Sequence, residues 1–451
     1  MKIRRISDFQ YSFSFLSSTE ELEKFKARFL MSDLGKIYSA IPWKNLVKSF
    51  KITEAIKGPD CIFSPQGKLG LMFLKHYACC SDKRLIEQLN SNYNYQFFCG
   101  IYLGFDTLEN YKIVSQIRCE LAADLNISST EKILFNYWSK YIDEQEKATT
   151  DATCYESEVR YPTDQKLLKE SVDWCYKQMK IICKSLGVKL PRTKYLKWSK
   201  RYVGYSKMRR KTTKKRTSIT RAFLKLLRKL LAEIKTLEKQ HYFTMPNRFY
   251  KTLNTVKKIF SQQYLLFEKG EKPKNRIVSI SKDYLRPIVR GKEIKKVEFG
   301  AKVNKLQIDG INFIQKISFD NFNEGTQFKN TVYKAQGLTN RKIKILGADA
   351  IYATNKNRVF ATSNHIQTDF KPKGRPSKHH KEQKKLKKMI TKERASRLEG
   401  GFGKEKEHYH LKKIKAKTKP TEILWIFFGI HTANCLEIGR RMQNQILQKV
   451  A

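Results

Sequence analysis

An α/β fold is indicated by one stretch of the chain, Glu298-Phe-Gly-Ala-Lys-Val-Asn-Lys-Leu-Gln-Ile308-Asp309-Gly310-Ile311-Asn-Phe-Ile-Gln-Lys-Ile-Ser-Phe319. On either side of Asp309-Gly310 the apolar and polar residues alternate, which is the pattern of strands. Asp-Gly is also a preferred pair for a two-residue hairpin turn, because both positions of that turn take positive φ angles. The stretch therefore predicts two antiparallel strands joined by a tight turn.

The residues that follow extend this hairpin into a sheet. Residues 322–336 have the pattern of a helix that ends at Gly337, and residues 342–346 predict a buried strand leading into Gly347-Ala-Asp349. A hairpin, a helix and a strand in this order indicate an α/β sheet with mixed strand directions, flanked by helices. An apolar helix from Glu422 to Met442 is expected to pack against the sheet.

Another strand is predicted upstream, in Ala148-Thr-Thr-Asp151-Ala-Thr-Cys-Tyr-Glu156-Ser-Glu158-Val-Arg160-Tyr-Pro162-Thr-Asp164. The stretch is rich in Thr, Tyr and Val, and Pro162 stops it. Asp164 is then expected to cap a long amphipathic helix. The predicted strand carries an acidic residue, Asp151.

The charge of the chain points to an anionic partner. Its 451 residues include 91 Lys and Arg against 42 Asp and Glu, a formal net charge of +49. Nucleic acid is the first candidate. A membrane surface competes, but the basic residues are spread over the whole chain and no lipidation or signal pattern opens it. The longest apolar run, Ile423 to Ile430, is far shorter than the roughly 20 residues of a membrane span, so we expect a soluble protein without a membrane partner.

Residues 1–145 are expected to form a helical N-terminal domain. Pro42 and Pro65 suit the first turns of two helices, and Ser81 suits the N-cap of a third. The two helices that meet near Ser81 predict either a helix-turn-helix unit that reads DNA or an ordinary helical hairpin.

Residues 165–275 are predicted to be helical and basic. They contain the run Lys207-Met-Arg-Arg-Lys-Thr-Thr-Lys-Lys-Arg216, which is either a solvated or disordered segment or a stripe that neutralises phosphates. Apolar residues at three- and four-residue spacing from Phe223 to Leu237 predict a helix that pairs with residues 247–267. We expect a helical hairpin here and no cofactor site.

Three acidic residues occupy distinctive positions: Asp151 on the first strand, Asp349 just after a later strand, and Glu399 on a late helix. Carboxylates from two strands and one helix can converge on a pair of Mg²⁺ or Mn²⁺ ions, which prefer oxygen ligands. Two such ions about 4 Å apart can clamp both oxygens of a phosphodiester displacement. The acidic residues at 156, 158 and 164 are weaker alternatives, because they are expected at a helix cap, at solvent or beside a Lys.

Glu399 belongs to the basic stretch Arg394-Ala-Ser-Arg397-Leu-Glu399-Gly-Gly-Phe-Gly-Lys404-Glu-Lys406-Glu-His-Tyr409. On a helix, Glu399 and Lys406 would share one face. The glycines at 400, 401 and 403 would each cost roughly 1 kcal/mol in a helix interior, and so indicate a close backbone approach. A solvated helix end that frays at its glycines is the alternative. Upstream, the basic segment that begins Lys371-Pro-Lys-Gly374-Arg375-Pro376 resembles arms that thread Arg into the minor groove, or is a linker.

Four segments, in this order, carry a family resemblance: Asp151-Ala-Thr-Cys-Tyr-Glu with Tyr161-Pro-Thr-Asp, Glu298-Phe-Gly-Ala-Lys-Val, Gly347-Ala-Asp349-Ala-Ile-Tyr352-Ala-Thr-Asn-Lys-Asn-Arg358, and Leu398-Glu399-Gly-Gly-Phe-Gly-Lys-Glu-Lys406 with Tyr409. Together they resemble a bacterial insertion-sequence transposase of the DDE superfamily. Phe98-Cys-Gly-Ile101 and Tyr111 to Arg118 resemble the helical domain that commonly precedes the catalytic core in this group. The resemblance covers most of the chain.

The resemblance implies a ribonuclease-H-like core in which Asp151, Asp349 and Glu399 bind two divalent ions, Mg²⁺ or Mn²⁺. Cleavage would free a 3′-hydroxyl at the element end, and this hydroxyl would attack target DNA. Lys406, at the spacing of the family's Glu-x6-Lys pattern, would contact phosphate near the cut. The family's Arg and Tyr before the Glu are Ala395 and Lys392 here, and Arg394 or Arg397 are candidates to replace them. The expected DNA contacts are Lys406, Arg394, Arg397, Lys404, Tyr409, Arg358 and Arg375.

The spacing of the acids predicts the domain organisation. Asp151 and Asp349 are 349 − 151 = 198 residues apart, more than a compact core needs. We therefore expect residues 146–164 and 276–451 to form the core and residues 165–275 to be an insertion that holds element-end DNA or a second subunit. The expected partners are double-stranded DNA and, on DNA, at least a second copy of the chain, in the bacterial cytoplasm at the nucleoid. An inactive DNA-binding descendant of a transposase and a metal-dependent nuclease on the same fold are the rival hypotheses.

Overall fold

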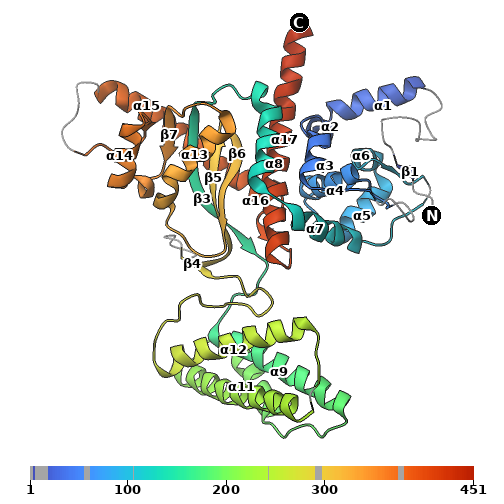
Figure 1. Cartoon of the computed structure of the whole chain (residues 1–451), viewed down its shortest axis with the longest axis vertical. Coiled ribbons are helices and arrows are strands. Elements are labelled where there is room, and N and C mark those ends of the chain that lie inside the picture. The colour runs from blue at the N-terminus through green and yellow to red at the C-terminus, as the bar shows by residue number, and fades with distance from the viewer. Residues whose placement is uncertain are drawn as a thin grey trace. The chain divides into compact units, whose positions relative to one another are not determined.

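The computed structural model describes residues 4–5, 19–54, 61–104, 106–241, 243–289, 297–373 and 380–450. They divide into two compact units, described here one at a time with the element labels of Figure 1. The sheet unit comprises Met1–Ser157, Ala301–Ser318 and Phe322–Ala451, and the bundle unit comprises Glu158–Gly300 and Phe319–Asn321.

A mixed sheet forms the centre of the sheet unit. Its strands are β3 (Lys147–Ser157), β5 (Val297–Ile308), β6 (Ile311–Ser318), β7 (Ile345–Ala348), β8 (Gln367–Thr368) and β9 (Lys413–Ile414). Strand β3 lies between β5 and β7, β8 lies on the far side of β7, and β6 pairs with β5. The β3–β7, β7–β8 and β3–β9 pairs are parallel, and the β5–β6 pair is antiparallel. The predicted mixed sheet with flanking helices is confirmed.

The predicted hairpin is confirmed in detail. Ile308 of β5 pairs with Ile311 of β6. Asp309 and Gly310 form the turn between them, with φ angles of 48° and 80°. Both residues thus take the left-handed conformation that a two-residue hairpin turn requires.

Two predicted helix limits are wrong. In place of a helix over 322–336, a 3₁₀ turn η2 (Glu324–Gln327) precedes α13 (Phe328–Thr339). The helix passes Gly337 because Asn340, with a φ of 54°, closes it instead. Asp164 is the first residue of the next long helix, and Thr163 is the residue whose side chain caps it, by accepting from the backbone N–H of Lys166.

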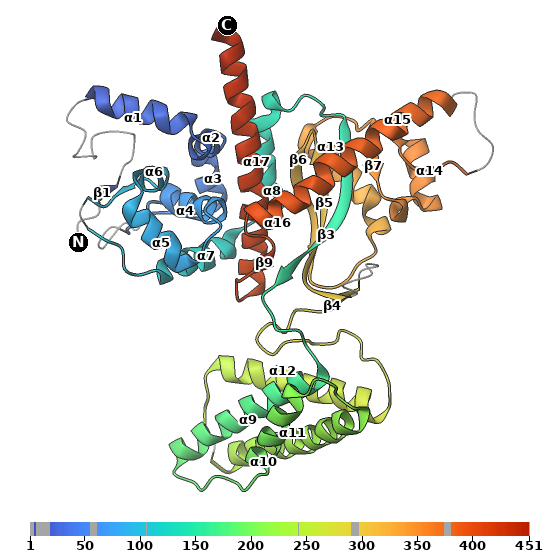
Figure 2. The ribbon, with the colours of Figure 1, turned by 180° about the vertical axis from the view of Figure 1, so that it is seen from behind.

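One long helix crosses the strands β3 and β7, as Figure 2 shows. It consists of α15 (His380–Glu393), a π-helical turn η4 (Arg394–Glu399) and α16 (Gly400–His408). Ile390 packs so closely on β7 that a Cβ atom at Gly347 would lie 2.4 Å from its Cγ2. Gly347 therefore allows the helix to approach the strand just before Asp349.

The C-terminal helix α17 (Lys419–Val450) confirms the apolar helix predicted over 422–442 and is longer than predicted. It packs against β6 and α16 of the sheet region and against the N-terminal helices α2, α4 and α7. The predicted helical N-terminal region is present as α1 (Thr19–Met31), α2 (Asp33–Ser39), α3 (Trp43–Ser49), α4 (Pro65–Tyr77), α5 (Asp82–Ser91), α6 (Tyr93–Phe98), α7 (Lys112–Asp124) and α8 (Ile127–Trp138). Two short strands, β1 (Arg4–Arg5) and β2 (Ile101–Tyr102), pair antiparallel.

Ion pairs to Asp82 connect α5 with α4 and α7. Ser81 caps α5, as predicted, by accepting a hydrogen bond from the backbone N–H of Arg84. Lys75 and Arg118 both pair with Asp82, at 2.7 and 2.9 Å. This packing is compatible with both interpretations of the α4–α5 pair, a helical hairpin or a helix-turn-helix unit.

The bundle unit consists of α9 (Asp164–Leu186), α10 (Tyr195–Lys207), α11 (Thr213–His241) and α12 (Asn247–Glu268), followed by β4 (Pro287–Val289), which pairs with the start of β5. The predicted pairing of the helix over 223–237 with residues 247–267 is confirmed, and α11 also packs along α9. Apolar residues such as Phe223, Leu227 and Val256 form its core. In the described part of the chain, no helix combines the length and apolar character of a membrane span.

Candidate active site

Asp151 and Asp349 follow matched positions on neighbouring strands. Strands β3 and β7 are parallel, with Thr149 opposite Gly347 and Thr150 opposite Ala348. The next residue on each strand is Asp151 and Asp349. Because neighbouring strands lie about 4.8 Å apart and paired residues point to the same face, the two carboxyl groups lie side by side. The structure therefore brings these two predicted residues together.

Local hydrogen bonds orient the two carboxyl groups. Asp349 caps the 3₁₀ turn η3 (Ala350–Tyr352) by accepting from the backbone N–H of Ala350 at 2.7 Å. Asp151 accepts from the backbone N–H of Ala152 at 2.7 Å. Asp349 lies at the carboxyl end of its parallel strand, where open α/β sheets commonly bind ligands. Its side chain is 55% exposed, so it is accessible to a bound polyanion.

Asp151 resists ionisation. Its pKa is raised to about 6, mainly by burial and also by the neighbouring carboxylates of Glu324 and Asp349, against opposing effects of the Ala152 N–H and Arg394. Burial and like charge both disfavour a carboxylate anion.

Glu324 is an acidic neighbour that the sequence did not reveal. It opens the turn η2, which packs against η3 beside Asp349. Lys302 of β5 pairs with it at 2.8 Å and is itself buried. The sequence did contain one signal for a buried ion pair: Lys302 lies within a predicted strand, and a buried lysine is almost always paired. The sequence did not indicate that Glu324 is its partner.

The π-helical turn determines where Glu399 lies. In an α-helix, residues five apart point about 140° away from each other, since each residue turns by about 100°. In a π-helical turn the hydrogen bonds join residues five apart. The turn over 394–399 therefore brings Glu399 to the same side of the helix as Arg394.

The residues on either side of Glu399 contact the two strands. Arg394 lies 3.4 Å from Asp349 and 3.0 Å from Asp369. Lys406 donates a hydrogen bond to the Thr153 hydroxyl on β3 at 3.0 Å. Glu399 itself is exposed. Among the described residues no three His, Cys, Asp or Glu side chains are grouped closely enough to hold a metal ion, so the helix carries Glu399 across the strands without joining it to the aspartates.

Arg397 and Lys404 lie in a different place from Arg394 and Lys406. They line a cavity of about 380 Å³ at the β5–β6 turn, together with Arg441 of α17. Arg397 pairs with Asp309 at 3.1 Å. The predicted basic residues thus form two groups, one along β3 and β7 and one at this cavity.

Two of the three glycines border the same cavity. Gly400 and Gly401 both line it, and a Cβ atom at Gly400 would meet no other group within 4 Å. Helix α16 is regular at these positions, so the glycines do not fray it. A close approach is present at Gly401 alone, where a Cβ atom would lie 3.3 Å from the Asn312 amide nitrogen; at Gly400 and Gly403 the predicted close approach is wrong.

The remaining predicted DNA contacts have varied surroundings. Tyr409 is buried, with 4% of its surface exposed, and burial is the main cause that raises its pKa to about 12. Arg358 is half-buried, stacked over Phe370, and donates to the carbonyl of Ala353. Arg375 lies outside the described residues. Of the alternative acids, Asp164 belongs to the bundle unit, where it pairs with Arg276.

A buried polar network fixes α16 on the sheet. Glu405 is 1% exposed, and its carboxylate accepts from Lys305 of β5 and from the hydroxyl of Tyr155 of β3. Asn312 of β6 donates to its other oxygen at 3.0 Å. Burial lowers the pKa of Lys305 and raises that of Tyr155. Three strands thus hold one residue of the helix that carries Glu399 and Lys406.

Asp151→Asn is expected to stabilise the metal-free protein at pH 7.5 by roughly 1–2 kcal/mol, allowing for solvent screening of a part-exposed group. The folded-state pKa of about 6 lies above the ordinary value near 4, so ionisation of Asp151 costs stability as pH rises from about 4 to 6. The gain should vanish near pH 4, where the carboxyl is protonated in both states. Thermal melting with a chelator at both pH values measures this.

The matched control for this prediction is Asp106→Asn, at an exposed aspartate of the same unit. It should leave the melting temperature unchanged at both pH values. An equal loss of stability in Asp151→Asn at pH 7.5 and pH 4 would show that Asp151 is not under electrostatic strain.

Comparison with known families gives one match. Residues 346–430 match the family model of the transposase DDE domain, a segment that contains Asp349, Glu399 and Lys406. Comparison with the curated proteins and with the solved structures gives no match. The matched segment begins on β7, runs through the helix across the strands and ends within α17. Residues 346–430 are therefore similar to a transposase DDE domain.

Proposed function

We propose that the chain is a DNA transposase that cuts the ends of a bacterial insertion element and joins them to target DNA. The observation that carries the proposal is the register of β3 and β7, which brings Asp151 beside Asp349. Asp349 and Glu399 also lie within the matched DDE segment. The net charge of +49 suits a DNA substrate, because neutralised phosphates release counterions.

The proposed catalytic core has a ribonuclease-H-like fold formed by residues 146–164 and 276–451. Residues 1–145 would bind DNA or a second subunit, and residues 165–275 would be an insertion in the core. Joining two element ends requires at least two copies of the chain on DNA, and we propose a homodimer or a larger assembly. Its place of action would be the bacterial cytoplasm, at the nucleoid.

Asp151, Asp349 and Glu399 would hold two Mg²⁺ or Mn²⁺ ions. The strand pair suits such ions, because its ligands are hard oxygens and the carboxyl groups of Asp151 and Asp349 lie beside each other. When bound, the ions stabilise charge on the attacking and leaving oxygens of the phosphodiester. Glu399 would complete the set after its exposed side chain turns toward the aspartates.

The surrounding cations would position the DNA. Lys406 and Arg394 flank Glu399 along the helix, so both are suited to bind phosphates near the cut. Arg394 also holds Asp349 and Asp369 in place. Arg397 and Lys404 would bind DNA from the cavity at the β5–β6 turn. Arg358 and Arg375 stay as predicted DNA contacts, whereas the buried Tyr409 is better suited to packing.

A cleavage and joining assay tests the proposal. The substrate is linear DNA that carries the two flanks of the gene, together with a target plasmid and Mg²⁺. We expect joined product from the wild-type chain and none with a chelator. Glu399→Gln should lower the yield at least a hundredfold, because a lost ligand removes several kcal/mol of transition-state stabilisation.

The matched control is Glu407→Gln, at an exposed glutamate eight residues further along the same helix that pairs with Lys412. It should retain full activity. DNA binding without any cleavage would instead identify an inactive DNA-binding descendant. Metal-dependent cleavage without joined product would identify a nuclease.

A further inference from the structure

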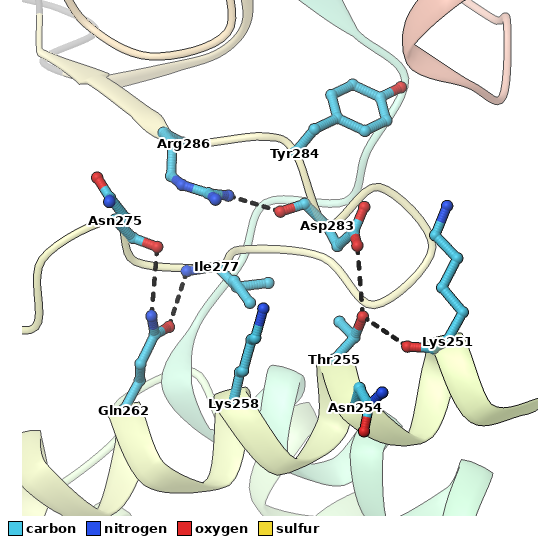
Figure 3. Close-up of a pocket in the computed structure, with 10 residues that line it drawn as sticks. All are labelled: Lys251, Asn254, Thr255, Lys258, Gln262, Asn275, Ile277, Asp283, Tyr284 and Arg286. Carbon is cyan, nitrogen blue, oxygen red and sulfur yellow. Dashed lines mark hydrogen bonds between the residues drawn. The ribbon is translucent and has the colours of Figure 1, made fainter.

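A polar cavity of about 480 Å³ lies in the bundle unit, between helix α12 and the loop over residues 275–286. Figure 3 shows its lining. Lys251 and Lys258 extend from α12 toward the loop, and Arg286 faces them from the loop side. The cavity is far in sequence from the DDE segment, and the proposed chemistry does not use it.

The sequence of α12 creates the helix side of this cavity. Leu253, Val256 and Ile259 are buried in the bundle core. A polar stripe runs along another side of the helix at spacings of three and four residues, namely Lys251, Asn254, Lys258 and Gln262. Since residues three and four apart share a helix face, packing of the apolar side turns the whole polar stripe toward the loop.

Hydrogen bonds fix the loop in place. Gln262 accepts from the backbone N–H of Ile277 at 2.9 Å and donates to the carbonyl of Asn275 at 3.2 Å. Arg286 donates through Nη1 to the carbonyls of Asp283 and Leu285, at 2.6 and 2.9 Å. The guanidinium is therefore held at the cavity before any ligand arrives, which lowers the entropy cost of binding.

The cavity is electropositive. Its lining contains three cations, Lys251, Lys258 and Arg286, and one acid, Asp283. In the described part of the chain no carboxylate lies within ion-pair distance of Lys251 or Lys258. Lysines on a convex surface are usually just solvated, but here two of them and an anchored arginine converge on one concavity. An anion that enters it gains attraction from all three.

We propose that this cavity binds a phosphate of the DNA backbone. Its cations suit a phosphodiester group: the lysines act as mobile point charges, and the anchored Arg286 offers a planar donor set, part of whose charge is offset by Asp320 at 3.6 Å. The side-chain amide of Asn254 adds a neutral donor on the same stripe. The inference rests on the proposed function for the identity of the polyanion, and it makes the bundle unit a second DNA-binding surface.

The test measures binding of labelled double-stranded DNA to the full chain at several salt concentrations. Lys251→Gln with Lys258→Gln should weaken binding by roughly tenfold or more at 0.1 M salt, and should lower the slope of log K against log salt by about 2. Asn254→Asp, which places an anion in the cavity, should weaken binding as well. Both sets lie on exposed positions, so the melting temperature should match that of the wild type.

The matched control is Lys257→Gln, a neighbouring exposed lysine of α12 that does not line the cavity. Lys257→Gln should change the slope of log K against log salt by less than half of the change caused by substituting either cavity lysine. Equal effects of Lys257→Gln and Lys258→Gln would overturn the proposal, because they would show a general charge effect. Unchanged DNA binding in the double variant, with loss of binding to inorganic phosphate or ATP, would also overturn it.

The outcomes separate this inference from the proposed function. If the wild-type chain binds and joins DNA and the cavity variants bind it equally well, the cavity proposal fails and the proposed function stands. If the wild-type chain binds no DNA at any salt concentration, both the cavity proposal and the proposed function fail.

Discussion

Asp349→Asn is expected to lower the rate of metal-dependent DNA cleavage by about a thousandfold. Asp349 stands beside Asp151 at the end of β7, where it would be a direct ligand of the catalytic ions. Loss of one carboxylate ligand removes several kcal/mol of transition-state charge stabilisation, and about 4 kcal/mol corresponds to a thousandfold in rate. The amide oxygen of Asn can still accept from the Ala350 N–H, so the turn η3 should keep its cap.

The same variant should bind DNA at least as tightly as the wild type. Its side chain is half exposed, and removal of a negative charge there reduces repulsion of the DNA phosphates. Single-turnover cleavage and equilibrium binding, measured in parallel, separate the two effects. Asp124→Asn, at the exposed end of α7, is the control and should change neither. A cleavage rate of Asp349→Asn within tenfold of the wild type would rule out a ligand role.

Lys305→Met is expected to destabilise the sheet unit by about 3–5 kcal/mol. Lys305 and Glu405 are almost fully buried, so removal of the lysine leaves an uncompensated carboxylate in the core. The helix that carries Glu399 and Lys406 would lose one of its anchors on β5. Chemical unfolding followed by the near-ultraviolet signal of the buried aromatic residues measures the loss.

A second substitution should restore most of this stability. Glu405→Gln added to Lys305→Met removes the buried charge and keeps one oxygen that can accept from the hydroxyl of Tyr155. Lys344→Met is the contrasting single variant, because Lys344 pairs with Glu146 at the surface, where ion pairs contribute about 0–1 kcal/mol. Additive losses in the double variant, with no rescue, would contradict the role of charge burial.

The parts of the fold that were predictable are those with local causes. The β5–β6 hairpin follows from period-two alternation and from a turn that needs two positive φ angles, so Asp309-Gly310 specified it without help from distant residues. The apolar side of α17 predicted its burial for the same kind of reason. The start of α13 was predicted too early, because the limit of a helix depends on small free-energy differences between competing turns. Here the 3₁₀ turn η2 occupies the residues before the helix.

The candidate site also contains residues that were predictable from local sequence and residues that were not. Asp349 was predictable from its position directly after a buried strand, and Asp151 from its strand and the family resemblance. Glu324 and Glu405 were not, since each is defined by a partner more than twenty residues away, Lys302 or Lys305. The π-helical turn was also invisible, because a helix-forming sequence looks alike whether its hydrogen bonds join residues four or five apart.

The sequence by itself determined the basic character of the chain, its mixed α/β sheet and its helical N-terminal region, and it supplied the three acids as a prediction. Only the tertiary structure decided that Asp151 and Asp349 are neighbours, because strand register depends on packing over 198 residues of intervening chain. It also decided that Arg394 contacts Asp349 and Lys406 contacts Thr153, while Arg397 and Lys404 line a separate cavity. The physical reason is that a residue's type and spacing are local, whereas its neighbours across a sheet are set by which surfaces the whole chain buries.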